Sequence, residues 1–575
     1  MAATPDPQNS AATTVPRSAS DVPEAERERF PVAWAGWADP AHREPLADDL
    51  LGLIRGAFGV SGETVAAPGA PEAIELPASS LADAGRAALT AVVGIEHVQD
   101  DHDVRLRHAG GKSTPDLLDL RGDRLIEVPD AVVLPASPDE VQRVIEVCRD
   151  ERIAVVPFGG GTSVVGGLRA LRGDLDAVIA LDLRRLDRLV AIDPVDQTAT
   201  LQAGLLTPQA DALLQPHGFF IGHYPQSYER GSIGGYAATR SSGQASSGYG
   251  RFDQMVVGLR LATPSGELQL GGGPPNAAGP DLRQLVLGSE GTLGVITEVT
   301  IRVQPLPRAQ RYEGWALPSF AAGSAALRDL ARSGERPTVM RMSDEVETAM
   351  RLATVTEDAE GATVEETEPT DEQSAGRCLV VVGWDGPDQA AVDGRAERAG
   401  QILRRHGGIA QGTEPGEAWK RGRFHAPYLR DALLDMGMLV ETLETVTTWS
   451  RLDALRARVV PAIQEALTAQ SGAPVIIMSH VSHVYSEGAS LYLTVVTKGG
   501  DDPAATTGIW EHGKRAAGDV LAAEQASITH HHAVGTDHAP WMTAEIGALG
   551  VAIVQAVKDR LDPTGVMNPG KLLPR

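Results

Sequence analysis

Cysteine is nearly absent from this 575-residue chain, which contains only Cys148 and Cys378. Two cysteines cannot build a disulfide framework or a cysteine zinc site, and Cys148 falls in a predicted helix, where it packs as a small apolar residue. Basic residues are also in deficit, 51 against 76 acidic ones, for a net charge of −25. Nucleic acid requires a basic face, so we expect no nucleic-acid partner, although a local basic pocket for a small anion is compatible with this charge.

Long apolar runs are missing too. No stretch of about 18 consecutive apolar residues occurs, so we expect no transmembrane helix. We also find no clear basic amphipathic helix that would hold the chain to a membrane surface. Residues 1–30 begin with a stretch rich in Ala, Thr, Ser and Pro that lacks the basic and apolar regions of a signal peptide, which predicts a disordered tail. We therefore expect a soluble, cytoplasmic protein.

The most informative stretch is Pro157-Phe158-Gly159-Gly160-Gly161-Thr162-Ser163, which follows an apolar strand pattern at 153–156. Three adjacent glycines let backbone N–H groups converge on one point with no Cβ in the way, which makes a cradle for a diphosphate. The run is neither GxxxxGK[ST] nor GxGxxG. By itself a glycine triplet is most often a flexible loop, so the rest of the sequence must show whether this one binds a diphosphate.

The chain around this run divides into two units. The first unit ends near Pro307, and periodicity and turn residues predict for it strands at 131–134, 153–157, 177–183, 198–203 and 297–303, helices at 138–152 and 208–215, and a hairpin at 256–262 and 267–270. Beyond Arg311, apolar strands are predicted at 378–382, 474–478 and 489–496, and helices at 389–405, 452–469 and 509–524. Within this second unit, Glu357 to Glu372 holds eight acids and no Lys or Arg, which indicates a solvated insertion without a function of its own.

Three separated glycine-rich loops, 157–167, 226–242 and 290–296, followed by the C-terminal LDPTGVMNPGK, resemble the FAD-binding type-4 family, whose fold is shared with vanillyl-alcohol oxidase. The resemblance spans residues 116–573. It implies an α+β fold, in which a two-part FAD-binding domain of vanillyl-alcohol oxidase type is joined to an α+β cap (substrate) domain with an antiparallel sheet. The expected segments are a disordered tail (1–30), a helical or irregular segment (31–115), the FAD-binding domain (116–307), the cap domain (308–540) and a C-terminal segment that returns to the FAD domain (541–575).

The resemblance implies FAD as cofactor, and no residue matches a covalent attachment site, so we expect FAD to be held noncovalently. A long cofactor with two phosphates needs several backbone-lined loops rather than one charged pocket. The residues implied to bind FAD are Pro157, Phe158, Gly159, Gly160, Gly161, Thr162, Ser163, Gln226, Ser227, Tyr228, Glu229, Arg230, Gly231, Ser232, Thr239, Arg240, Ser241, Ser242, Glu290, Gly291, Thr292, Leu293, Gly294, Val295 and Ile296.

Within that family, the second unit is similar to the alkyldihydroxyacetone-phosphate (alkylglycerone-phosphate) synthases. FHAPYLRD at 424–431 places a substrate-binding role on Arg430, and GASLY at 488–492 places the catalytic role on Tyr492. THHHAVG at 529–535 matches a triple-histidine loop, with His530, His531 and His532 as catalytic candidates. The related lactate and glycolate dehydrogenases usually show a single histidine there.

Each of these residues also has an alternative interpretation. Arginine offers a planar fork that grips phosphate or carboxylate, but Arg430 could instead form a surface ion pair with Asp431 or Asp435. A tyrosine in mid-strand is often a packing residue. Consecutive histidines alternate faces, so at most two reach one ligand. A metal site joining His530–His532 with His480 and His483 is disfavoured because no carboxylate or cysteine completes a usual set, so we expect no metal.

The implied reaction exchanges the acyl chain of acyl-dihydroxyacetone phosphate for a fatty alcohol in ether-lipid synthesis, through a transient bond to flavin N5. Tyr492 would be the general acid–base, and Arg430 would hold the phosphate. The chain departs from the synthases at Thr536, Asp537 and His538, where they carry basic residues, and at Gln226, where they carry aspartate. A lipid-like substrate is compatible with peripheral membrane association. A homodimer is a further alternative. Two other interpretations remain: an FAD-dependent D-2-hydroxyacid dehydrogenase or oxidase (lactate or glycolate type), and a flavin-binding protein without turnover.

Overall fold

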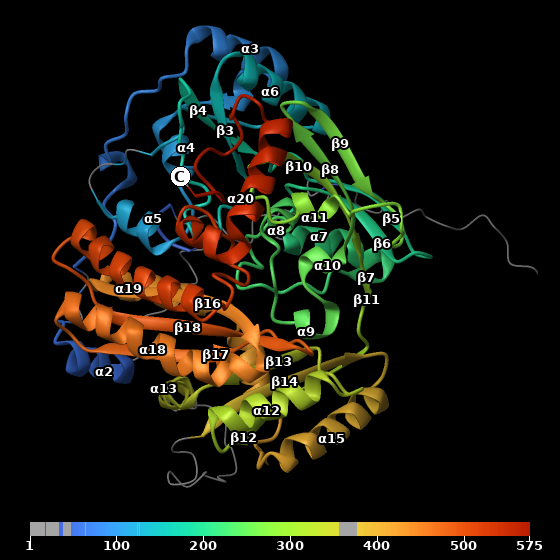
Figure 1. Ribbon diagram of the computed structural model, residues 1–575, viewed down its shortest axis with the longest axis vertical. Coiled ribbons are helices and arrows are strands. Elements are labelled where there is room, and N and C mark those ends of the chain that lie inside the picture. Colours follow the sequence, from blue (N-terminus) through green and yellow to red (C-terminus); the bar gives the residue numbers. More distant parts are fainter. Residues whose placement is uncertain are drawn as a thin grey trace, which may run out of the picture.

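The computed structural model describes Ser18, residues 34–37 and residues 46–574, with gaps at 47, 62, 64, 123–124, 126 and 356–376. The acidic block 357–372 and the predicted N-terminal tail, apart from Ser18, lie outside the described residues. Figure 1 shows the first unit above, in blue, teal and green, and the second unit below, in yellow and orange.

The first unit opens with a four-stranded sheet of order β1-β2-β4-β3, in which β2, β4 and β3 run parallel. Apolar side chains of two helices, α3 and α6, share a buried core with it. Helix α6 begins where predicted, because Ser137 Oγ accepts the N–H of Glu140 at 3.2 Å. The bounds are α3 Asp83–Val93, β1 Val98–Gln99, α4 His102–Arg107, α5 Thr114–Asp119, β2 Ala131–Val133, α6 Pro138–Asp150, β3 Ile153–Phe158 and β4 Ala177–Asp182.

A second sheet completes the first unit with five antiparallel strands in the order β5-β6-β10-β8-β9. Helices α7, α8 and α10 bury apolar side chains against it. The bounds are β5 Leu189–Asp193, β6 Thr198–Gln202, α7 Thr207–Leu214, β7 Phe219–Phe220, α8 Ile233–Thr239, α9 Ser246–Tyr249, α10 Phe252–Met255, β8 Val256–Thr263, β9 Gly266–Gly271, α11 Arg283–Val286, β10 Val295–Arg302 and β11 Gln304–Pro305.

The second unit is built on a seven-stranded sheet of order β15-β12-β14-β13-β17-β18-β16, whose neighbouring strands are all antiparallel. Helices α12, α15, α18 and α19 contribute to its apolar core, and Figure 1 shows them in the lower half. The bounds are β12 Ala309–Leu317, α12 Phe320–Ala331, β13 Val339–Ser343, α13 Glu345–Val355, β14 Cys378–Gly386, α15 Gln389–Arg405, β15 Ile409–Ala410, α16 Glu414–Gly422, α17 Ala426–Asp435, β16 Met438–Thr448, α18 Trp449–Ser471, β17 Val475–Val481, β18 Gly488–Lys498 and α19 Pro503–Ala523.

The two ends of the described chain each cross to the other unit. Helix α2 (Asp48–Phe58) buries Ile54 and Phe58 in an apolar cluster with residues of α17 and β16. At the other end, Val155 of β3 donates to the carbonyl of Val566 at 2.8 Å, and Asn568 N–H donates back to the carbonyl of Val155 at 2.8 Å. The C-terminal segment therefore extends the first sheet next to β3, which carries the first glycine loop.

Helix α20 (Met542–Leu561) differs from the other long helices because it is exposed. The stretch Ala539–Leu561 is long and apolar enough to cross a membrane by length and composition, and 6% of its most apolar window is buried. No such segment was expected, since Glu545, Gly547 and Gly550 interrupt the apolar run while its mean hydropathy stays high. Its C-terminal end is fixed to the first unit by Lys558 Nζ, which donates to the carbonyls of Thr292 and Met567 at 2.9 Å each.

Candidate active site

Strand pairing places three chemically active side chains in one row of the large sheet. Tyr492 of β18 lies directly opposite Glu444 of β16 on one side and opposite His480 of β17 on the other. Directly opposed residues of antiparallel strands point to the same face, so the three side chains share one face. The His480 ring stacks on Tyr492 with centroids 4.5 Å apart and an interplanar angle of 13°.

The carboxylate of Glu444 holds the triple-histidine loop above this row. It accepts the backbone N–H groups of His530, His531 and His532 at 2.6, 3.2 and 3.0 Å, and the hydroxyl of Thr529 at 2.5 Å. Burial by itself would raise the pKa of Glu444, but the neighbouring histidines, His531 first, and the Thr529 hydrogen bond hold that pKa well below its usual value. Glu444 is therefore an ionised anchor, and it was absent from the predicted site residues.

A second buried carboxylate holds the far end of the same loop. Glu290, predicted to bind FAD, directs its side chain to the N–H groups of Val534 and Gly535, both at 2.8 Å. Burial raises the pKa of Glu290 to about 7, against the lowering effect of these two hydrogen bonds. The loop is thus fixed by one carboxylate from each unit.

The histidine rings surround Tyr492 unequally. His531 stacks on Tyr492 at 5.9 Å, and His532 meets it edge-on at 5.6 Å. His530 faces elsewhere, since its Nε2 lies 2.7 Å from the hydroxyl of Tyr485. Two of the three histidines therefore reach the tyrosine, which agrees with the predicted maximum of two. They are the adjacent His531 and His532, however, and not the pair His530 and His532 that strict alternation would bring to one face.

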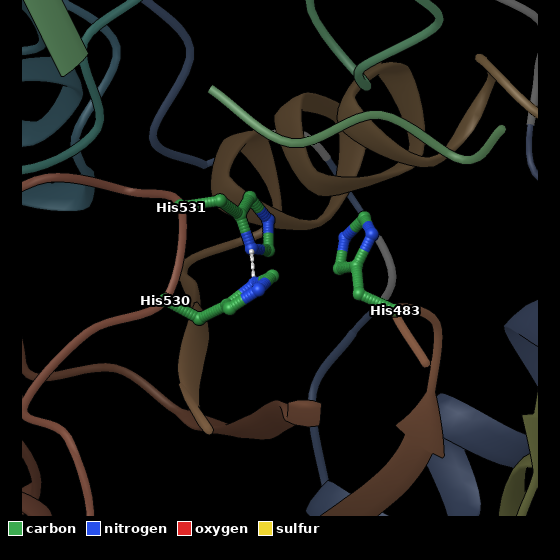
Figure 2. A group of neighbouring side chains, drawn as sticks. All are labelled: His483, His530 and His531. Atoms are coloured by element: carbon green, nitrogen blue, oxygen red, sulfur yellow. Dashed lines mark hydrogen bonds between the residues drawn. The ribbon is translucent and has the colours of Figure 1, made fainter. Parts of the chain in front are cut away.

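Figure 2 shows that His530 and His531 converge with His483, which comes from the end of β17. The ring nitrogens of these three residues lie within 4.8 Å of one another, a spacing that could hold a metal ion, although the trio has no carboxylate or thiolate. Burial lowers the pKa of all three and of His532. Burial also raises the pKa of Tyr492 to about 12. At neutral pH the site therefore holds neutral imidazoles beside a protonated phenol.

Arg430 of α17 is buried with part of its guanidinium unsatisfied. Its Nη1 donates to the carbonyl of Lys112 at 2.8 Å, while Nε and Nη2 have no hydrogen-bond partner among the described residues. Asp435 binds Arg121 at 2.7 Å, and Arg430 forms a long ion pair with Asp431, whose Oδ1 lies 3.8 Å from Nη2. A buried cation with two spare donors is suited to an anionic ligand.

The three glycine-rich loops meet at one place in the first unit. A Cβ on Gly160 would lie 1.6 Å from the carbonyl oxygen of Arg230 in the second loop, and one on Gly291 would lie 2.7 Å from Pro157. Gly161 has a φ of 72° and Gly291 of 75°, a left-handed conformation that favours glycine. Gln226 Nε2 is buried there without a partner among the described residues. A glycine-lined junction with spare donors fits a dinucleotide cofactor such as FAD.

Several predicted FAD residues place their side chains within the protein. Leu293, Val295 and Ile296 are buried in the apolar core. Six further residues of this predicted set form hydrogen bonds within the protein. These are the Tyr228 hydroxyl to Asp211 at 3.0 Å, the Tyr428 hydroxyl to Glu229 at 3.1 Å, Arg240 to the Leu287 carbonyl at 2.9 Å, Thr239 to the Gly235 carbonyl at 2.9 Å, Ser241 with His223 at 3.0 Å, and the Gly235 N–H to Ser232, the N-cap of α8, at 3.2 Å. Ser242 Oγ lies 3.1 Å from His483 Nδ1, which joins the second loop to the histidine cluster.

Comparison with known protein families finds a separate match for each of the two units. Residues 129–271 match the FAD binding domain model, and residues 306–572 match the model of the C-terminal domain of FAD linked oxidases. The fold and the site therefore define an FAD-binding protein of the FAD-linked oxidase class. The α+β fold predicted from the loops, with its antiparallel cap sheet, is confirmed.

Comparison with individual proteins narrows the class. The chain is 32% identical over 488 residues to the alkyldihydroxyacetonephosphate synthase of Dictyostelium discoideum, covering 83% of this chain and 79% of the relative. It is 33% identical over 507 residues to that of Trypanosoma brucei brucei, covering 84% and 80%. A solved alkyldihydroxyacetonephosphate synthase superposes with a TM-score of 0.78 at 27% identity, covering 94% of this chain and 99% of that one. The chain belongs to the alkyldihydroxyacetonephosphate synthase family.

Proposed function

We propose that this protein is an FAD-dependent transferase that exchanges the acyl chain of acyl-dihydroxyacetone phosphate for a fatty alcohol. The observation that carries the proposal is Tyr492, which is protonated and in contact with two neutral histidines. The nearby Arg430 keeps two buried guanidinium nitrogens, Nε and Nη2, without a hydrogen-bond partner in the described part of the chain. The membership in the synthase family agrees with it.

We assign a separate role in the reaction to each of the protein's own groups. Arg430 binds the substrate phosphate through Nε and Nη2. The Tyr492 hydroxyl moves the proton on the substrate carbon beside the acyl oxygen, and His531 and His532 take up and return that proton. When bound, FAD supplies an oxidised, electrophilic ring. Glu444 and Glu290 hold the histidine loop in place, so that these groups need no rearrangement during the reaction.

The first prediction separates this transferase from a 2-hydroxyacid dehydrogenase or oxidase. Under anaerobic conditions, D-lactate, glycolate and D-2-hydroxyglutarate should leave the flavin absorbance unchanged. Acyl-dihydroxyacetone phosphate with a fatty alcohol should release fatty acid and form the ether product. Bleaching by a hydroxy acid would favour the dehydrogenase, in which Arg430 binds a carboxylate. Acid precipitation of the same sample should leave the flavin in solution, as expected for noncovalent FAD.

We further propose that α20 holds the enzyme against a bilayer surface, the source of a lipid substrate. Beyond its non-helical residue Gly547, the helix exposes 76% of Leu549 and 53% of Ile553, and Ile546 before it is 38% exposed. Leu549 and Ile553 are four residues apart, so they lie on one side of the helix. Because Lys558 fixes the helix end to the first unit, this stripe lies along the surface, as an interfacial helix does.

The second prediction tests that stripe. Leu549→Glu combined with Ile553→Glu should weaken cosedimentation with phosphatidylcholine vesicles by about tenfold or more, since each apolar side chain contributes roughly 1.5–3 kcal/mol when buried. Val195→Glu, at an exposed valine of the first unit, is the matched control and should bind as the wild type does. If the double variant instead converts a dimer to a monomer without altering vesicle binding, the stripe is an interface between two copies.

A further inference from the structure

His530 links the histidines beside Tyr492 to a second tyrosine. Its Nδ1 lies 3.1 Å from Nδ1 of His531, a contact drawn as a dashed line in Figure 2. Its Nε2 lies 2.7 Å from the hydroxyl of Tyr485. His531 in turn stacks on Tyr492. Both ring nitrogens of His530 are therefore engaged in one chain of hydrogen bonds, which leads from the histidine beside Tyr492 to Tyr485.

Tyr485 lies in the connection between β17 and β18. Its N–H donates to the carbonyl of Gly488 at 2.9 Å, and its own carbonyl accepts the indole N–H of Trp449 at 3.0 Å. The residue is half-buried and the two residues after it are exposed, whereas His530 is only 5% exposed. The chain of hydrogen bonds therefore runs from the buried site toward solvent.

The hydrogen bonds of this chain can point in either direction. A neutral imidazole carries one N–H, so one ring nitrogen donates and the other accepts. In the first arrangement His531 Nδ1–H donates to His530, and His530 Nε2–H donates to the oxygen of Tyr485. In the second arrangement Tyr485 donates to His530 Nε2, and His530 Nδ1–H donates to His531. Shifting one proton along each hydrogen bond converts the first arrangement into the second.

The charges around the chain favour His531 as the residue where a proton enters. Oε2 of the ionised Glu444 lies 3.6 Å from His531 Nδ1. Burial lowers the pKa of His531, but Glu444 opposes that effect, whereas burial and the neighbouring His531 together hold the pKa of His530 well below its ordinary value. Burial raises the pKa of Tyr485, against the lowering effect of Arg251, so the hydroxyl keeps a proton that it can pass on.

We propose that His530 and Tyr485 form a proton relay between His531 and solvent water. This inference rests on the proposed function, in which Tyr492 and His531 take the proton from the substrate carbon. That proton binds Nε2 of His531, whose Nδ1–H bond breaks as an Nδ1–H bond forms on His530. The Nε2–H bond of His530 breaks as an O–H bond forms on Tyr485, and the original hydroxyl proton goes to water. One proton enters and one leaves, and the reverse shift returns a proton to the substrate.

Tyr485→Phe removes the outer end of the relay and keeps the ring. The test substrate is acyl-dihydroxyacetone phosphate with both hydrogens of the carbon beside the acyl oxygen replaced by deuterium, and the ether product is analysed by mass spectrometry. The wild type should lose one of the two deuterons to water. The variant should return that deuteron to the carbon and retain both, with kcat lowered about tenfold, less than the full effect of a general acid–base. Tyr249→Phe is the matched control, since Tyr249 is a half-buried tyrosine whose hydroxyl donates to Asp385 at 2.6 Å. It should lose one deuteron as the wild type does.

His530→Gln interrupts the relay at its centre and replaces the first variant if that one does not fold. Glutamine keeps the backbone N–H that donates to Glu444 at 2.6 Å, but its amide cannot take up a proton at one atom and release it at another. It should also retain both deuterons. If a folded, FAD-loaded variant slows exchange but still loses one deuteron, the proton leaves by another route and the relay is overturned.

The tautomer of His530, measured without turnover, distinguishes failure of the relay from failure of the proposed function. In FAD-loaded protein with isotopically labelled histidine, nuclear magnetic resonance should place the His530 proton of the wild type on Nε2, because the neighbouring carboxylate favours the arrangement with hydrogen on His531 Nδ1. Tyr485→Phe should move it to Nδ1, since a buried Nε2–H would lose its acceptor. His538, whose Nδ1 lies 2.8 Å from the carbonyl of Ala533, is the internal control and should not change. The same tautomer in both proteins would overturn the relay whatever the reaction. A changed tautomer in a protein that catalyses no acyl-for-alcohol exchange would uphold the relay and reject the transferase function.

Discussion

Replacing Tyr492 by phenylalanine is expected to lower kcat for acyl-for-alcohol exchange by about 10³-fold, within the range that one general acid–base contributes. The change removes only the hydroxyl and leaves the ring that stacks on His480 and His531. FAD content and the melting temperature should stay close to those of the wild type. The measurement is steady-state exchange on flavin-saturated protein, with the flavin absorbance read on the same sample.

Tyr312→Phe is the matched control for this substitution. Tyr312 likewise lies on a strand of the seven-stranded sheet, where it is buried and packs against Trp419. It should keep its activity. Two outcomes would contradict the catalytic role of Tyr492: a variant with near-normal exchange, or one that loses its flavin, which would make Tyr492 a packing residue.

The parts of the fold and site that were predictable depend on local pattern. Helix α15 has the bounds 389–405 that its periodicity predicts, and α6 begins at the predicted N-cap. The glycine loops were recognisable because close approaches such as Gly160 to Arg230 exclude any side chain, so the requirement is written in the residue type itself.

The parts that escaped prediction depend on long-range pairing. Strand β16 was missed, and with it Glu444, because only its pairing with β18 places that carboxylate opposite Tyr492. Nothing local indicates that Lys112, more than 300 residues before Arg430, contacts that arginine. Glu290 was found by its loop, but the hydrogen bond from its side chain to the distant histidine loop was not predicted. Exposed α20 was missed because Glu545 and two glycines interrupt its apolar run.

Glu444→Gln is expected to disorganise the histidine loop and lower kcat about 100-fold, the cost of misplacing catalytic groups by roughly 1 Å. A glutamine keeps the size but removes the charge that accepts three backbone N–H groups, and its NH₂ group cannot accept them. The loss should cost about 2–4 kcal/mol of unfolding free energy. Glu441→Gln, three residues away on the opposite face of β16, where Trp510 donates to it, is the control and should preserve exchange and flavin content.

The pH dependence of unfolding separates the two carboxylates that hold this loop. The folded-state pKa of Glu444 lies well below 4.5, so the stability it contributes is present above about pH 4.5 and is lost as the pH falls toward the folded value. Glu290 has the opposite sign. Its pKa is raised from 4.5 to about 7, so its ionisation removes stability as the pH rises through that interval. Urea unfolding across pH 3–8 should therefore show a flatter acid limb in Glu444→Gln, while Glu290→Gln should lose less stability than the wild type between about pH 4.5 and 7. Parallel curves for both variants and the wild type would show that folding shifts the pKa of neither carboxylate, and would contradict both assignments.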